Sequence, residues 1–80
     1  MDCFYVYAIK SCKRNYIYVG LTSNPQRRIE EHSRGKERTT RSYAPFRTLL
    51  VERYNSRLEA RKREKYLKTG IGKDRLRSIV

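Results

Sequence analysis

The chain is poor in the residues that build cross-links, metal clusters and membrane spans. It holds two cysteines, one histidine and no tryptophan among 80 residues. Cys3 and Cys12 cannot form a disulfide framework, and together with one histidine they are too few for a zinc site. No apolar run approaches the roughly 18 residues of a membrane helix. The N-terminal residues do not resemble a signal peptide. We therefore expect a cytoplasmic protein with free thiols.

Acidic residues are also scarce. Lys and Arg number 20 against 8 Asp and Glu, for a net charge of +12. The excess grows along the chain, from three basic and one acidic residue in 1–26 to ten and three in 53–80. A polyanion is the natural partner, and nucleic acid is the commonest one. A membrane surface is disfavoured because no segment joins a wide apolar face to a basic one. A structural protein of the ribosome or nucleoid fits the same composition.

The first 21 residues predict a β-hairpin. Strands are expected over 4–10 and 16–21, around a loop at 11–14. The register that keeps apolar residues together pairs Phe4 with Leu21, Val6 with Val19, and Ala8 with Ile17. Its other face pairs Tyr5 with Gly20, Tyr7 with Tyr18, and Ile9 with Tyr16. A slip of one residue would mix these sets, so the pattern favours one core face and one tyrosine-lined face.

Helix signals follow the hairpin. Ser23 or Asn24 before Pro25 predicts a helix that runs to residue 32 or 33. A basic loop over 34–46 and a strand over 47–54 come next. Ser56 then opens a helix over 57–69 that Gly70 closes, and a short helix over 73–79 returns Leu76 and Ile79 to the core. The fold class is therefore α+β, one domain over 1–80, with a three-stranded antiparallel sheet flanked by helices in the order β-β-α-β-α-α.

Glu64 stands out in the second long helix. It shares a stripe with Ala60 and Leu67, at spacings of four and three, while the rest of the helix surface is basic. One interpretation is an ion pair with Arg61 or Lys68, worth roughly 0.3–0.5 kcal/mol on a helix surface. The other is a metal ligand that faces the tyrosine side of the sheet.

The pattern as a whole resembles the GIY-YIG nuclease family. Tyr5-Val6-Tyr7 and Tyr18-Val19-Gly20 match its two triplets, with Tyr5 and Val6 in place of the first Gly and Ile. An arginine eight residues after Gly20, a histidine four further on, and a glutamate in a later helix complete the match. No Asn follows Asn55, where many members have one. The resemblance is greatest to small stand-alone members related to the UvrC N-terminal nuclease and to homing endonucleases.

The resemblance implies a metal-dependent DNA endonuclease. Its catalytic residues would be Tyr7, Tyr18, Arg28, His32 and Glu64, with Glu64 as the ligand of Mg²⁺ or Mn²⁺. Arg28 would offer a bidentate fork to the phosphate, and Tyr7 is the favoured base. Free tyrosine has a pKa of about 10, which we expect the positive protein and a nearby cation to lower. Without the family match, an aromatic pair is the favoured interpretation of Tyr7 and Tyr18, and a structural or orienting role for His32 stands at least level with proton transfer.

Contacts to nucleic acid are expected from one glycine and eight basic residues: Gly20, Arg27, Lys36, Arg38, Arg41, Arg61, Lys62, Lys65 and Lys68. The substrate would be DNA, in branched, damaged or single-stranded form, in repair or recombination. A catalytically weak binding module that acts with a partner is the alternative. No membrane contact is expected, and a protein partner or a homodimer stays open.

Overall fold

The computed structural model describes residues 3–79. A hairpin of β1 (Phe4–Ser11) and β2 (Ile17–Thr22) is followed by α1 (Pro25–Ser33) and a short 3-10 helix, η1 (Arg41–Tyr43). Then come β3 (Phe46–Tyr54), α2 (Arg57–Leu67) and α3 (Gly70–Arg77). The strands form one antiparallel sheet in the order β2-β1-β3. The predicted fold class and element order are confirmed. Within the described residues, no helix is long and apolar enough to cross a bilayer.

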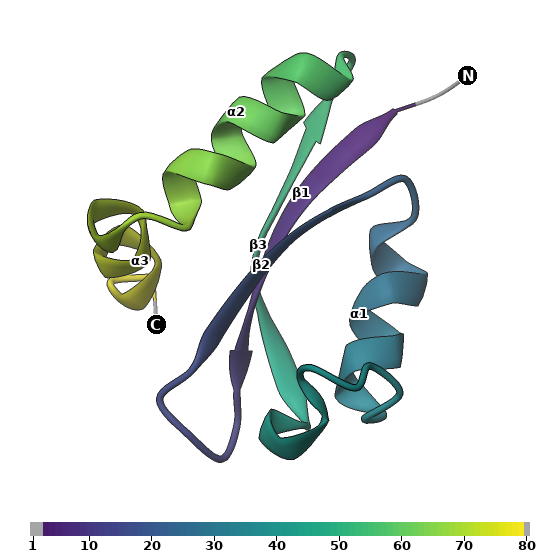
Figure 1. Ribbon diagram of the computed structural model, residues 1–80, viewed down its shortest axis with the longest axis vertical. Helices are drawn as coiled ribbons and strands as arrows, with labels where there is room; N and C mark the ends of the chain where they lie inside the picture. The colour runs from purple at the N-terminus through teal and green to yellow at the C-terminus, as the bar shows by residue number, and fades with distance from the viewer. Residues whose placement is uncertain (1–2, 80) are drawn as a thin grey trace.

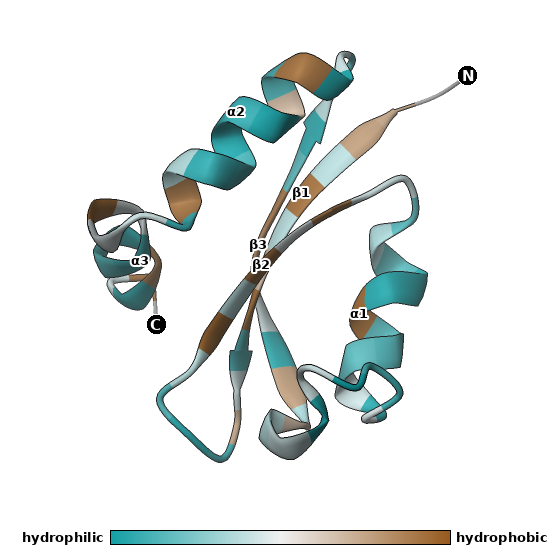
Figure 2. Ribbon diagram, in the orientation of Figure 1, coloured by the Kyte–Doolittle hydropathy of each residue, from teal (hydrophilic) through white to brown (hydrophobic). Residues whose placement is uncertain are grey.

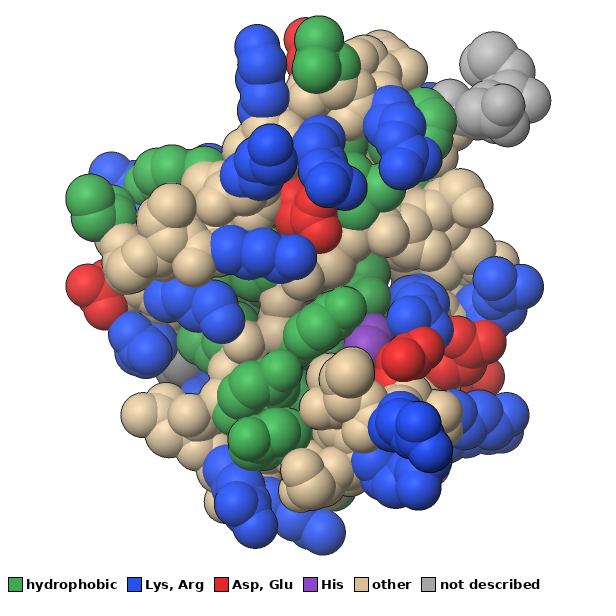
Figure 3. All heavy atoms as spheres, in the orientation of Figure 1, with side chains coloured by type: hydrophobic (Ala, Val, Ile, Leu, Met, Phe, Trp, Pro, Cys, Tyr) green, Lys and Arg blue, Asp and Glu red, His purple; other side chains and the backbone are tan. Residues whose placement is uncertain are grey.

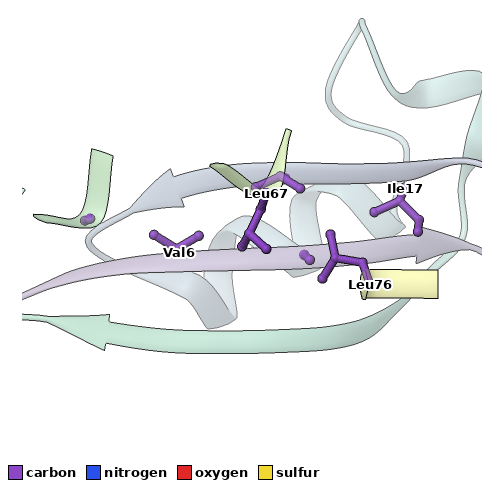
Figure 4. Packing of buried hydrophobic residues seen from close by; sticks show 7 residues of the cluster. Val6, Ile17, Leu67 and Leu76 are labelled. Atoms are coloured by element: carbon purple, nitrogen blue, oxygen red, sulfur yellow. The ribbon is translucent and has the colours of Figure 1, made fainter. Parts of the chain in front are cut away.

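Helices cover both faces of the sheet. Figure 1 looks onto the β2 edge, with α1 on one side and α2 and α3 on the other. The face under α2 and α3 is the predicted core face, where Val6 and Ile17 meet Leu67 and Leu76 (Figure 4). The face under α1 carries Tyr7, Ile9 and Phe46, with partly buried tyrosines around them. Figure 2 shows the helices as largely hydrophilic, with α1 turning a hydrophobic stretch towards the sheet.

The predicted hairpin register is wrong by two residues. Val6 pairs with Leu21, Ala8 with Val19, and Tyr7 with Gly20 rather than Tyr18. A shift of two keeps every side chain on its own face, so the apolar pattern could not distinguish the two registers. The turn settles the choice: the Ser11 hydroxyl accepts hydrogen bonds from the N–H groups of Lys13 and Arg14, at 3.1 and 3.0 Å.

The helix predictions hold for α1 and need correction after α2. Asn24 is the residue that caps α1, with its side chain accepting the Arg27 N–H. The second long helix ends at Leu67 rather than residue 69, and Gly70 opens α3 instead of closing α2. The reason is Thr69, whose hydroxyl accepts the Gly72 N–H and starts the new helix. Leu76 is buried as expected, but Ile79 is 49% exposed.

Candidate active site

The Tyr7 ring lies directly against Gly20. The two residues are paired across β1 and β2, and a Cβ on Gly20 would meet the Tyr7 Cζ and hydroxyl oxygen at 2.5 Å. Glycine is therefore required here by space. Since β2 is an edge strand, the absent side chain lets a tyrosine from the central strand extend its hydroxyl towards the rim of the sheet. Gly20 is itself buried, and its contact with nucleic acid stays a prediction.

A buried chain of hydrogen bonds starts at this hydroxyl. Tyr7 Oη lies 3.0 Å from His32 Nε2, and His32 Nδ1 lies 2.8 Å from Thr40 Oγ1. Tyr7 is 1% exposed, and His32 and Thr40 are fully buried. The Tyr18 ring packs on the histidine, with centroids 4.7 Å apart. Thr40 was missed by the sequence analysis, because a threonine eight residues after a histidine in an irregular loop is no recognisable signal.

Burial controls the titration of this group. Removal from water raises the pKa of Tyr7 far above its usual value, and the neighbouring Tyr18 adds to the rise, while Arg28 opposes it. The expectation that the overall positive charge lowers this pKa is therefore wrong for the chain alone, since local desolvation outweighs distant charges. Burial, followed by the charge of Arg28, lowers the pKa of His32. The histidine is consequently neutral at neutral pH.

Arg28 lies beside these hydrogen-bonded residues, but its guanidinium already forms two ion pairs. Its Nη1 is 2.9 Å from Glu31, and its Nη2 is 2.6 Å from Glu37. About a third of each of these three side chains is exposed. Both terminal nitrogens of the Arg28 guanidinium are thus paired with carboxylates, and an incoming phosphate would have to compete with Glu31 and Glu37 for them. The partner Glu37 belongs to the same loop as Thr40 and was not predicted.

Glu64 is held on the other side of the sheet. It is 8% exposed, and its carboxylate lies 3.2 Å from Lys68 Nζ and 3.9 Å from Arg61 Nε. Both ion pairs that the sequence suggested are therefore formed. Among residues 3–79, no hydrogen bond or ion pair joins Glu64 to Tyr7, Tyr18, Arg28 or His32. The structure thus gathers four of the five predicted residues and leaves the fifth, Glu64, in the opposite layer, so the expectation that Glu64 faces the tyrosine side of the sheet is wrong.

The donor set suits a hydrated cation better than a metal cage. No cluster of three or more His, Cys, Asp or Glu side chains occurs in the described part of the chain. Mg²⁺ commonly keeps several waters and uses one or two carboxylates together with substrate phosphate. Glu64 fits such a site, provided that the cation displaces Lys68 or shares the carboxylate with it.

The predicted nucleic-acid contacts are basic side chains open to solvent. All eight are exposed: Arg27, Lys36, Arg38, Arg41, Arg61, Lys62, Lys65 and Lys68. Figure 3, in the orientation of Figure 1, shows basic side chains crowding α2, with a band of hydrophobic side chains between them and the α1 side. Arg57 and Arg61 also line a shallow hollow with Leu58. This surface matches the polyanion partner inferred from the composition.

Comparison with known proteins agrees with the geometry. The GIY-YIG catalytic domain matches residues 3–76. A UPF0213 protein of Staphylococcus haemolyticus is 37% identical over 76 residues, covering 94% of this chain and 92% of that protein. A UPF0213 protein of Staphylococcus aureus is 34% identical over 80 residues, covering 99% and 96%. The solution structure of a UPF0213 protein from Bacillus halodurans is 31% identical, with a TM-score of 0.58 over 96% of this chain and 84% of that one. The chain belongs to the GIY-YIG nuclease family, as its triplets and their spacing predicted.

Proposed function

We propose that this chain is an endonuclease that hydrolyses phosphodiester bonds of DNA with the help of a divalent cation. The observation that carries the proposal is the contact between the Tyr7 hydroxyl and His32, at 3.0 Å beneath Gly20 and beside Arg28. A tyrosine stacked in a simple aromatic pair needs neither a glycine opposite its hydroxyl nor a buried histidine on its oxygen.

Each side chain has a defined task in this proposal. Tyr7 acts as the phenolate: after its own proton has passed to solvent, its oxygen takes the proton of the attacking water, and His32 holds that oxygen in place. Arg28 binds the non-bridging phosphate oxygens with its two guanidinium nitrogens once Glu31 and Glu37 release them. Tyr18, which is partly exposed, lines the approach of the substrate. Such positioning and charge stabilisation supply most of the acceleration in phosphoryl transfer.

Glu64 would hold a hydrated Mg²⁺ or Mn²⁺ from the α2 side. When bound, the cation supplies charge stabilisation for the phosphate oxygens and water of lowered pKa. Because α1 and α2 cover opposite faces of the sheet, the two halves of the site are expected to meet at the β2 edge. The phosphate backbone would lie along this edge, in contact with the basic side chains of α2 (Figure 3).

The proposed substrate class rests on the basic surface rather than on an element that contacts the edges of DNA bases. The described residues form one small sheet and its helices, so recognition would rest on basic side chains that contact phosphates without regard to sequence. We propose branched, damaged or single-stranded DNA as the substrate, in repair or recombination, recognised without regard to sequence. A protein partner or a second copy of the chain would add further selectivity.

A nucleic-acid-binding module without turnover is the second candidate. Two observations favour it: Tyr7 is 1% exposed, and Arg28 is bound by two carboxylates. In this conformation the basic surface is open to DNA, whereas the tyrosine hydroxyl is not open to bulk water.

Cleavage of supercoiled plasmid and of branched DNA in Mg²⁺ or Mn²⁺ distinguishes the two. An endonuclease nicks both, and Glu64→Gln and Arg28→Ala abolish the nicking without loss of the fold. Glu59→Gln on α2 and Arg34→Ala after α1, both exposed, serve as matched controls and keep the activity. If the wild type and all variants nick at the same background rate while binding DNA with a steep salt dependence, the binding module is correct.

A further inference from the structure

Thr40 is a fully buried residue whose hydroxyl contacts the candidate site through one atom. Its Oγ1 lies 2.8 Å from His32 Nδ1, and the histidine in turn lies 3.0 Å from the Tyr7 hydroxyl. The three residues come from the loop before η1, from α1 and from β1. No other hydrogen-bond partner of the Thr40 hydroxyl occurs within residues 3–79. The positions of the hydrogens in this series of hydrogen bonds therefore decide whether His32 donates to the Tyr7 hydroxyl or accepts from it.

Two arrangements are compatible with a neutral histidine. In the first, Nδ1–H donates to Thr40, and the Tyr7 hydroxyl donates to Nε2. The Thr40 hydrogen then has no acceptor in a fully buried position, which is unfavourable. In the second, the Thr40 hydroxyl donates to Nδ1, and Nε2–H donates to the Tyr7 oxygen. The hydrogen without a fixed acceptor is then that of Tyr7, which is 1% exposed where Thr40 is fully buried, and whose hydroxyl lies over Gly20 in the edge strand β2.

We infer that the second arrangement holds, and that Thr40 is a positioning residue that keeps His32 in the tautomer with the proton on Nε2. His32 is then a donor to Tyr7 and never the acceptor of its proton. A donor on the phenol oxygen favours the phenolate, because hydrogen bonds to the charged form stabilise it. The Tyr7 hydrogen then has no acceptor among residues 3–79, and in the proposed reaction it passes to solvent before the oxygen acts as a base. The consequence for catalysis rests on the proposed function, whereas the tautomer itself does not.

The tautomer can be measured directly in the free protein. The chain has a single histidine, so two-dimensional ¹⁵N–¹H correlation spectra of the imidazole are unambiguous. We expect the wild type to carry its proton on Nε2 with Nδ1 unprotonated. Thr40→Val, which keeps the shape and removes the hydroxyl, is expected to shift the population towards Nδ1–H, and Thr40→Ser to restore the original tautomer. The neighbouring and exposed Thr39 supplies the control, Thr39→Val, which leaves the spectrum unchanged.

The kinetic readout separates this inference from the proposed function. In an active nuclease, Thr40→Val lowers the rate of plasmid nicking by roughly ten- to a hundredfold, the worth of one hydrogen bond to a charged group, while the DNA affinity stays the same. A wild type with its proton on Nδ1 overturns the inference whatever the activity. This measurement needs no variant, so it decides even if Thr40→Val fails to fold. If His32 carries its proton on Nε2 but the protein cleaves no DNA, the proposed nuclease function is wrong and the inference about the tautomer stands.

Discussion

The ammonium group of Lys68 lies 3.2 Å from the carboxylate of Glu64, where a metal-binding glutamate would present its oxygens to a cation. The proposed metal ligand is thus already paired with a positive side chain. A metal ion bound as proposed would compete with this lysine for the carboxylate, so its affinity would depend on residue 68, one helical turn away.

Replacement of Lys68 by methionine is therefore expected to tighten metal binding. Removal of one like charge at about 4 Å is worth ~1 kcal/mol even at the dielectric of water, or about fivefold in the dissociation constant of Mn²⁺. Calorimetry or the electron paramagnetic resonance of free Mn²⁺ measures this. Lys65→Met on the same helix is the control, because exposed Lys65 makes no ion pair with Glu64. Equal affinities for both variants would contradict a metal site at Glu64.

Gly20→Ala is expected to destabilise the fold by about 1–3 kcal/mol, the usual cost of overpacking. The new Cβ would lie 2.5 Å from the Tyr7 ring carbon and hydroxyl, so the ring has to move away from His32. Urea denaturation gives the free energy of unfolding. Gly70→Ala is the matched control, since no atom lies within 4 Å of its Cβ position. Comparable costs at the two positions would show that the ring does not rest on Gly20.

Glu37→Gln is expected to increase the affinity for DNA by releasing Arg28. The carboxylate lies 2.6 Å from the guanidinium, and its loss leaves one half of the fork free for phosphate. Loss of any negative charge strengthens DNA binding somewhat, so Glu30→Gln, which breaks the exposed pair with Arg34, gives the baseline. Fluorescence anisotropy with a short labelled duplex measures both. A gain for Glu37→Gln no larger than for Glu30→Gln would argue against phosphate contact by Arg28.

The stability of the protein is expected to fall as the pH drops below about 6.5. Burial and the charge of Arg28 lower the pKa of His32, against the opposing effects of Glu37 and Glu31. In the unfolded chain, the histidine takes up a proton near pH 6.5, whereas in the folded chain it does so only at lower pH. The free energy of unfolding therefore falls between these two pKa values as the pH drops. Arg28 lowers the pKa of Glu31, and at Glu52 burial raises the pKa but Arg63 and Tyr54 together lower it by more. These two groups therefore reduce the stability only below about pH 4.5.

Urea midpoints between about pH 7.5 and 5.5 test this sign. Because His32 is the only histidine, His32→Gln is expected to flatten the dependence in that window, whatever its own stability. A wild-type midpoint that stays constant or rises on acidification would mean that the buried imidazole is protonated.

The order of elements was predictable from the sequence because each has a local signal. Alternating apolar residues mark the strands, and Asn24 and Ser56 mark the helix starts. The hairpin register was not predictable, since shifts of two residues leave each face unchanged. The start of α3 was missed because Thr69 and Gly70 are each a plausible helix boundary.

The candidate site divides in the same way. The start signals at Ser23, Asn24 and Pro25 placed Arg28 and His32 on one helix, the likeness to a known family suggested their roles, and the structure brings both to Tyr7. Glu37 and Thr40 escaped prediction because their contacts depend on how a loop returns to α1. The raised pKa of Tyr7 was likewise out of reach, because composition gives charge but not desolvation.

Tyr7 belongs to the middle strand of the sheet, which is paired on both sides, whereas its companions belong to α1 and the loop that follows. Amide protons of β1 should therefore exchange with solvent only on global unfolding, while those of α1 exchange through smaller openings. Detachment of that helix alone would separate Arg28 and His32 from Tyr7 and leave the sheet folded, so the candidate site would be lost well before the sheet unfolds.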